Sequence, residues 1–162
     1  MRPIAGNITA PPVIAMDERN HPKRPFIGVG AIVFKGDRIL LIRRGKEPGR
    51  GKWSIPGGVV HLGETLEGAV RRELKEETGL EVEVVRLVEV FERIVPDEIG
   101  RVLYHYVLID YLCRVAGDRI RAGSDALEAA FYPLNALDQL ELTPGTGPVI
   151  LKAFELNKEI FS

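Results

Sequence analysis

The chain has 162 residues, of which 45% are hydrophobic and 28% are charged, so one folded domain with a single core is the expected organisation. Its 22 basic and 23 acidic residues give a net charge of −1, which excludes a general positive field that would attract nucleic acid. No apolar run reaches the length of a membrane span, and we expect no secretory signal. The single cysteine, Cys113, excludes an intrachain disulfide, which fits a reducing compartment. From the charge, the apolar runs and the cysteine together, we expect a cytoplasmic protein with no nucleic-acid or membrane partner.

The N-terminal segment, residues 1–25, contains five of the eleven prolines and shows no persistent hydrophobic period. We expect a proline-rich arm there, which is either flexible or docked on its own domain or on a second subunit. Residues 26–162 then form the folded domain. Its first two elements are an apolar, β-branched strand at residues 26–34 and a second strand at residues 38–44, joined as a hairpin.

A basic, glycine-rich loop at residues 45–52 follows this hairpin. Its composition is that of a solvated turn, and phosphate contact is the alternative. Arg43 and Arg44, at the end of the second strand, are candidates for substrate binding. Trp53, the only tryptophan, is either a core residue or a platform for a base, and we include it among the substrate-binding candidates.

An acidic helix is predicted at residues 65–78, because this segment is rich in helix-forming residues and Gly79 ends it. Glu73, Glu76 and Glu77 fall at positions i, i+3 and i+4 and therefore share one face. That face overlaps the apolar side of the helix, which brings three like charges beside the buried surface. A hard divalent cation with carboxylate oxygen ligands would offset their repulsion.

A glycine-rich loop leads into this helix. Gly57 and Gly58 follow a proline, and Gly63 directly precedes Glu64. Glycines allow a ligand to approach the backbone closely. A glycine-rich loop that ends in one carboxylate and continues into a helix with three more suits metal-assisted attack on a phosphate.

The stretch from Gly58 to Leu80 resembles the signature of the Nudix hydrolases, which it matches without departure at Gly58, Glu64, Arg72, Glu73, Leu74, Glu76, Glu77, Gly79 and Leu80. The match spans 23 of the 162 residues. The resemblance implies an α/β/α sandwich with a mixed β-sheet, in which the signature forms a loop, a helix and a loop.

The remaining elements agree with such an α+β fold. Their patterns predict three strands and two helices, the strands at residues 80–95, 101–115 and 129–134 and the helices at 135–140 and 149–161. The strand at 101–115 is apolar on both faces, which is typical of a central strand. Asn135 is the expected N-cap of the short helix. Strands placed between helices in this order indicate an α+β sandwich.

The Nudix resemblance also implies a reaction, namely hydrolysis of a pyrophosphate bond in a nucleoside diphosphate linked to another group. Mg²⁺ is the implied cofactor, with Mn²⁺ as the alternative. Carried over to this chain, the metal ligands are Glu73, Glu76 and Glu77, and a backbone carbonyl of Gly57 or Gly58 joins them.

The same resemblance gives roles to the other acids and to one arginine. Glu64 stands near the metals, and Arg72 holds the acids in place by ion pairing. The candidates for the general base are Glu76 and Glu77 on the helix and Glu128 on a loop from which some relatives supply an acid. An exposed loop glutamate without a catalytic role is the alternative for Glu128.

Pro96 bears on the substrate, which is expected to be a small-molecule nucleotide. It lies 16 residues after Leu80, and a proline at about this distance resembles the ADP-ribose pyrophosphatases. ADP-ribose, cleaved to AMP and ribose 5-phosphate, is therefore the leading substrate, and Pro96 is a substrate-binding candidate. The alternatives are a house-cleaning nucleoside triphosphate pyrophosphohydrolase and a non-catalytic nucleotide-binding domain. Many relatives are homodimers, so a homodimer is also expected.

Overall fold

The computed structural model describes residues 16–117, 119–123 and 125–162, so the first fifteen residues of the predicted arm lie outside the described residues. The elements follow in the order α1 (Met16–Arg19), β1 (Phe26–Lys35), β2 (Arg38–Arg44), β3 (Trp53–Ser54), β4 (Gly57–Val59), α2 (Leu66–Thr78), β5 (Val82–Pro96), β6 (Val102–Val115), β7 (Ala126–Pro133), the 3-10 helix η1 (Leu134–Gln139) and α3 (Thr146–Phe161). None of the helices in these ranges is long and apolar enough to cross a membrane.

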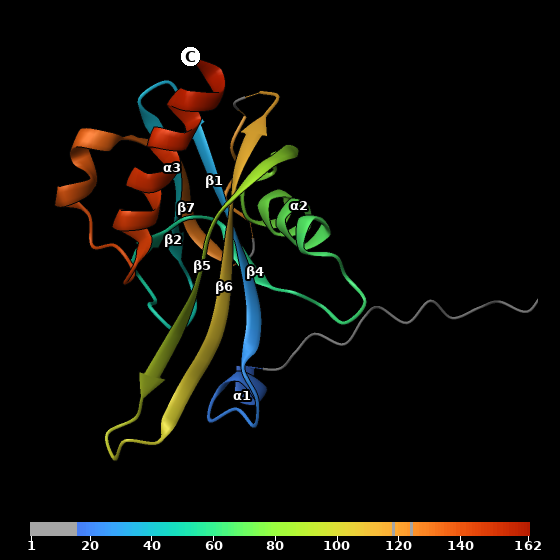
Figure 1. Cartoon of the computed structure of the whole chain (residues 1–162). Coiled ribbons are helices and arrows are strands. Elements are labelled where there is room, and N and C mark those ends of the chain that lie inside the picture. The colour runs from blue at the N-terminus through green and yellow to red at the C-terminus, as the bar shows by residue number, and fades with distance from the viewer. Residues whose placement is uncertain (1–15, 118, 124) are drawn as a thin grey trace, which may run out of the picture.

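The strands of the described residues form one seven-stranded mixed sheet with the order β3-β2-β1-β6-β5, in which β4 also pairs with β1 and β7 with β2. β1 runs parallel to β6, and the other strand pairs are antiparallel. Helices α2 and α3 lie on opposite sides of this sheet (Figure 1). The predicted α+β fold with a mixed sheet between helices is therefore confirmed, as is the central position of the strand that follows residue 101.

Strand β1 supplies side chains to the cores on both faces of the sheet, because successive residues of a strand point to opposite sides. Val29, Ala31 and Val33 pack with the buried residues of α2. Ile32 packs with Val149 and other buried residues of α3 on the other side. The two helices are thereby held at fixed positions against the same strand.

The hairpin of β1 and β2 is paired only near its turn. Phe34 pairs with Ile39 and Lys35 with Arg38, after which the two strands separate. β1 continues between β4 and β6, whereas β2 pairs with β7 and β3. The sheet is therefore split along its middle, and the space between the separated strands becomes the cavity described below.

The acidic helix ends before Gly79, as its sequence predicts, and begins one residue after the predicted start, at Leu66. Thr65 is the N-cap residue, and its hydroxyl group accepts a hydrogen bond from the backbone N–H of Gly68 at 3.0 Å. Gly79 ends the helix in the left-handed conformation with φ of 75°, which glycine adopts without strain. These caps set where α2 begins and ends.

Other boundaries differ from the prediction. α3 begins at Thr146 instead of residue 149, since Pro148 falls in the first turn, where its missing N–H is not needed. Asn135 is not an N-cap: η1 follows Pro133, and no side chain caps it. β3 and β4 were not predicted, because strands this short pair through backbone groups and carry no side-chain pattern.

The described part of the N-terminal segment contacts the β5–β6 hairpin beside its turn. The ring of His21 donates a hydrogen bond to the carboxylate of Asp97 at 2.9 Å, and its backbone N–H donates to Leu103 at 2.9 Å. This part of the segment therefore lies against the chain's own domain.

Candidate active site

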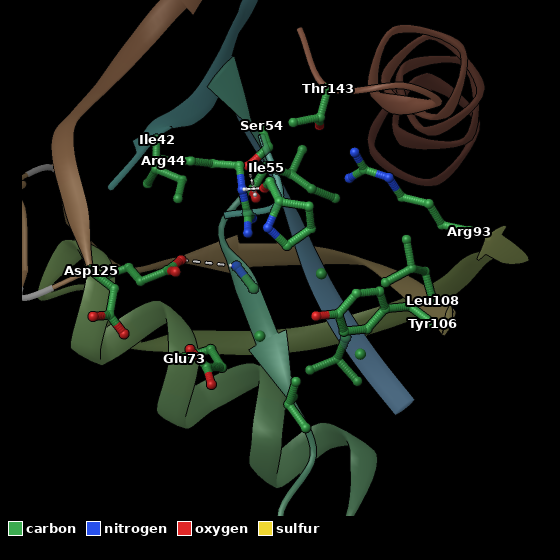
Figure 2. A pocket seen from close by; sticks show the side chains of 18 of the residues that line it. Ile42, Arg44, Ser54, Ile55, Glu73, Arg93, Tyr106, Leu108, Asp125 and Thr143 are labelled. Atoms are coloured by element: carbon green, nitrogen blue, oxygen red, sulfur yellow. Dashed lines mark hydrogen bonds between the residues drawn. The ribbon is translucent and has the colours of Figure 1, made fainter. Parts of the chain in front are cut away.

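A cavity of about 860 Å³ opens between the separated strands β1 and β2. Its walls come from β1, β2, β4, β5 and β6, from the acidic face of α2 and from the segment that leads into α3. Figure 2 shows Glu73 and Asp125 on one side of this space and Arg93 and Tyr106 on the other. The cavity therefore has an acidic end, at α2, and a far end, at β5 and β6.

Glu73, Glu76 and Glu77 all line the acidic end. Glu77 is only 6% exposed, and its carboxylate accepts a hydrogen bond from the backbone N–H of Gly57 at 2.9 Å. The side chain of Glu73 is 13% exposed and that of Glu76 is 54% exposed, so Glu76 stands at the rim. Helical spacing thus brings the three acids to one cavity, at three depths.

The two inner carboxyl groups are poorly compensated by the protein itself. Burial, followed by the nearby charge of Glu73, raises the pKa of Glu77 to about 8, against the opposing effects of the Gly57 N–H and Arg44. Burial also raises the pKa of Glu73, although Arg72 opposes the shift. A site that disfavours its own carboxylate charges is one that a hard cation would stabilise.

Arg72 is the hub that joins the acids of α2 to the preceding loop. Its guanidinium group binds Glu64 through two hydrogen bonds, of 2.7 and 2.8 Å, and donates to Glu73 at 2.7 Å. A weaker contact of 3.4 Å reaches Glu76, and another hydrogen bond reaches the carbonyl group of Val59 at 3.0 Å. The bond to Arg72 is the largest cause that lowers the pKa of Glu64 to about 2.

These contacts bear on whether the acids can hold a metal ion. Within the described ranges, no three His, Cys, Asp or Glu side chains stand close enough together to hold an ion as they lie. Glu73 and Glu76 are instead turned towards Arg72. The donor set still fits a hard cation, because three carboxylates face one cavity and the most buried of them has no ion pair with any residue that the structure describes.

Gly57 and Gly58 on β4 are required by space. A Cβ atom on Gly58 would overlap the carboxylate of Glu73, and one on Gly57 would overlap the backbone of Val29. Neither glycine has a positive φ, so it is the close approach of neighbouring groups, not the backbone conformation, that needs glycine here. The peptide groups of β4 therefore lie directly against the inner glutamates.

Of the two arginines proposed for substrate binding, Arg44 lines the cavity and Arg43 does not. They diverge because neighbouring residues of a strand point to opposite sides. Arg44 donates a hydrogen bond to the carbonyl group of Pro48 at 2.7 Å, and burial lowers its pKa. Arg43 instead bonds Gly51 and forms an ion pair of 3.1 Å with Glu128 on the neighbouring strand β7.

Four further predicted residues do not belong to the described lining of the cavity, namely Glu64, which is bonded to Arg72, and Glu128, Trp53 and Pro96. Glu128 is held by Arg43 on the other side of β2. Trp53 packs edge-on against Tyr132 with ring centres 4.8 Å apart, which is the core alternative for this residue. Pro96 is the last residue of β5, beyond Arg93, which does line the cavity.

Asp125 is the acid that the loop before β7 brings to the cavity, three residues before Glu128. It forms an ion pair of 2.7 Å with Lys46, and its charge raises the pKa of both Glu73 and Glu77. The sequence analysis expected an acid from this loop and named Glu128, but the sequence alone does not indicate which of the loop's acids faces the cavity.

At the far end of the cavity, sequence reasoning reached only Arg93 and Phe91, which flank Pro96 and were expected either to contact a ribose phosphate or a base or to be surface and core residues. It did not indicate Tyr106. Arg93 on β5 and Tyr106 on β6 are a cross-strand pair that lines it. Burial and the charge of Arg44 lower the pKa of Arg93, and no ion pair reaches Arg93 from the described part of the chain. The available signal was an arginine among apolar residues of a strand, which by itself does not indicate which side it faces.

Comparison with known proteins identifies the family. The NUDIX domain model matches residues 24–153, which is most of the chain. The chain therefore belongs to the family of Nudix hydrolases. Such hydrolases generally need divalent metal ions.

Individual relatives give a closer view. The chain is 43% identical to the ADP-ribose pyrophosphatase of Methanocaldococcus jannaschii over 72% of its own length and 66% of that protein. It is 33% identical to the human 8-oxo-dGDP phosphatase NUDT18 over 69% of its length, but spans only 33% of that protein. The crystal structure of a MutT NUDIX hydrolase from Burkholderia pseudomallei superposes with a TM-score of 0.70 at 31% identity, covering 80% of this chain and 98% of the other.

Proposed function

We propose that this Nudix hydrolase cleaves ADP-ribose to AMP and ribose 5-phosphate. The observation that carries the proposal is one cavity with under-compensated carboxylates at one end and Arg44 and Arg93 opposite them. A diphosphate with two sugar-linked ends suits such a division of charge, because cationic groups can bind phosphate oxygens beside a metal site. The similarity to an ADP-ribose pyrophosphatase supports the choice of substrate.

The candidate ligands for the metal are Glu73, Glu76 and Glu77 with a backbone carbonyl of Gly57 or Gly58, and Mg²⁺ is the proposed ion, with Mn²⁺ as the alternative. When bound, the ion supplies positive charge for the diphosphate and acidifies a water molecule. Arg72 keeps Glu73 and Glu76 oriented by hydrogen bonds and holds Glu64 beside them.

The remaining side chains bind the substrate and move a proton. Arg44 and Arg93 would pair with the phosphate oxygens. Asp125 takes the place of Glu128 as the loop carboxylate that accepts the proton of the attacking water, because it is the one that lines the cavity. The oxygen of that water bonds to one phosphorus, and the bridging P–O bond breaks.

A substrate panel tests this function. It should contain ADP-ribose, other nucleotide sugars, dinucleoside polyphosphates and normal and oxidised nucleoside di- and triphosphates, each with Mg²⁺ and with Mn²⁺, with products separated by chromatography. We expect AMP and ribose 5-phosphate from ADP-ribose as the fastest reaction. Faster release of pyrophosphate or phosphate from the free nucleotides would instead favour the house-cleaning class, and binding without cleavage would favour a nucleotide-binding domain.

The expected homodimer stays a prediction. Size-exclusion chromatography of the full chain and of a variant without residues 1–20 tests both the dimer and a role of the arm in it. A monomer in both samples would remove this prediction.

A further inference from the structure

Asp110 is a buried acid that the reaction proposed above does not use. It lies in the middle of β6, lines the cavity and is only 4% exposed. No hydrogen bond or ion pair reaches its carboxyl group from the residues that the structure describes. Its cross-strand neighbour on β5, Glu89, is engaged by Lys152 at 2.7 Å, so that lysine does not serve Asp110. An unpaired carboxyl group in such a position destabilises the fold and needs another explanation.

Gly30 makes room for this carboxyl group. It pairs with Asp110 across β1 and β6, and a Cβ atom on it would overlap the Asp110 carboxylate and lie 2.7 Å from the side chain of Ile55. The backbone of Gly30 has no positive φ, so its conformation does not require glycine. Glycine in the interior of a strand also weakens the strand. A buried carboxyl group without a described partner and a glycine inside a strand, each unfavourable for the fold, therefore lie at one point of the cavity. Such a combination is typical of a binding position.

The surroundings of Asp110 are apolar and partly aromatic. Leu108, two residues earlier on the same face of β6, lines the cavity beside its cross-strand partner Phe91. Ile55, which directly follows β3, and Val149 on α3 also line the cavity. Apolar side chains beside an unpaired carboxyl group suit a flat heterocycle better than a sugar, which presents many hydroxyl groups.

The register of the sheet places Asp110 apart from the acidic end. Gly57, Gly30 and Asp110 lie in one row across three neighbouring strands. Neighbouring strands are about 4.8 Å apart, so Asp110 is about 10 Å from Gly57, which contacts Glu77. The backbone of Asp110 therefore lies two strands away from the N–H group that bonds Glu77, and the spacing suits a nucleoside that extends from a diphosphate held at α2.

We propose that Asp110 recognises the nucleobase of the substrate through a hydrogen bond with a ring-bound amino group, such as that of adenine. The inference rests on the proposed function only in taking the substrate to be a nucleotide. Burial raises the pKa of Asp110 to about 7, so its protonated form is accessible at neutral pH. That form can accept a bond from the amino group and donate one to the adjacent ring nitrogen.

Calorimetric titration with AMP and with ribose 5-phosphate, in the presence of Mg²⁺, tests the base site directly. Asp110→Leu removes the hydrogen bond at similar size, Asp110→Asn retains a donor and an acceptor, and Asp138→Asn is a control at an exposed position in η1. We expect the Kd for AMP to rise at least tenfold in Asp110→Leu and less than threefold in Asp110→Asn, with ribose 5-phosphate unaffected. Unchanged AMP binding in Asp110→Leu, or equal losses for both ligands, would overturn the proposal.

Steady-state kinetics separate this inference from the function on which it rests. ADP-ribose should be compared with its 1,N⁶-etheno derivative, in which the amino group and the ring nitrogen are blocked. We expect Asp110→Leu to raise KM for ADP-ribose, to leave kcat nearly unchanged and to abolish the preference over the etheno form. An enzyme that ignores ADP-ribose contradicts the proposed function, whereas AMP titration still decides the role of Asp110. Cleavage of ADP-ribose with AMP binding that does not depend on Asp110 contradicts this inference alone.

Thermal unfolding of the same variants excludes a merely structural role. Since Asp110 has no partner among the described residues, Asp110→Leu and Asp110→Asn should unfold at or above the wild-type temperature. A lower unfolding temperature in both variants would show that Asp110 supports the fold and would contradict its assignment to the base.

Discussion

At the acidic end of the cavity, Gly57, Glu73 and Glu77 come from one short stretch of the chain, whereas at the far end Phe91, Tyr106 and Asp110 come from two long strands. The acidic end is held by local geometry, namely one helix, its caps and the hub at Arg72. The far end depends on strand register and on which side of the sheet each residue faces. The acidic end, built from neighbouring residues, contains groups suited to chemistry common to a family. The far end, built from residues distant in the sequence, contains groups suited to choosing a substrate.

The largest expected effect is at the acidic end. Glu77→Gln keeps the shape of the side chain and can still accept the hydrogen bond from Gly57, but it removes the charge and basicity. We expect kcat for ADP-ribose to fall by about a thousandfold or more while the fold persists, because the substitution acts on the metal site. Steady-state kinetics and circular dichroism measure the two effects, with the exposed Glu83→Gln as the control. Activity within a few-fold of wild type would remove these glutamates as the metal site.

The second largest expected effect distinguishes Asp125 from Glu128, which lie on either side of the start of β7. Asp125→Asn removes the proposed proton acceptor, and we expect kcat to fall by about a hundredfold. Glu128→Gln, its matched control, removes a carboxylate that pairs with Arg43 outside the described lining of the cavity, and activity should stay within about threefold. The reverse order of the two effects would restore Glu128 as the loop acid.

At the far end, Arg93→Gln should raise KM for ADP-ribose about tenfold. The reason is the loss of a charge-assisted hydrogen bond to a phosphate, which is worth about 1.5–3 kcal/mol. Arg43→Gln removes the same charge from an exposed ion pair, which contributes about 0–1 kcal/mol, and KM should change less than twofold. Initial rates over a range of ADP-ribose concentrations distinguish the two variants. Equal changes in KM for the two variants would contradict the proposal that Arg93 binds the substrate because it lines the cavity.

The smallest expected effect concerns stability without metal. The pKa of Glu77 is raised to about 8 in the folded protein, above its ordinary value of 4.5, so the folded state holds a proton that the unfolded state has released between these values. The free energy of unfolding therefore falls as the pH rises from about 4.5 to about 8. Asp110, with its pKa raised to about 7, adds to the same trend.

Thermal unfolding in a chelator across this pH range measures the trend. Glu77→Gln should flatten it, and added Mg²⁺ should raise the unfolding temperature most at the upper end of the range, where the ligands are deprotonated. A wild-type stability that rises between pH 5 and pH 8 without metal would contradict the burial of an uncompensated Glu77.

Residues close together in the sequence were predicted well because helix geometry alone relates them. A period of 3.6 residues determines that Glu73, Glu76 and Glu77 share a face, and the three line one cavity. Gly79 as the end of α2 follows equally from its lack of a side chain. The apolar, β-branched run at residues 26–34 likewise indicated the buried strand β1.

Contacts between distant residues could not be obtained in this way. Arg43 and Arg44 are neighbours with the same charge, and only the pairing of β2 with β7 decides that Arg44 faces the cavity. The same holds for Asp125 and Glu128 on their loop and strand. Trp53 is in the core because Tyr132 from a distant strand lies against it.

The sequence by itself therefore determined the α+β class, the capped acidic helix and the set of carboxylates that it brings to one face. Only the tertiary structure decided what stands opposite these carboxylates, namely Arg93 and the apolar region at Asp110. The physical reason is that helix geometry depends on neighbours along the chain, whereas the separation of β1 from β2 depends on pairing and packing with distant strands.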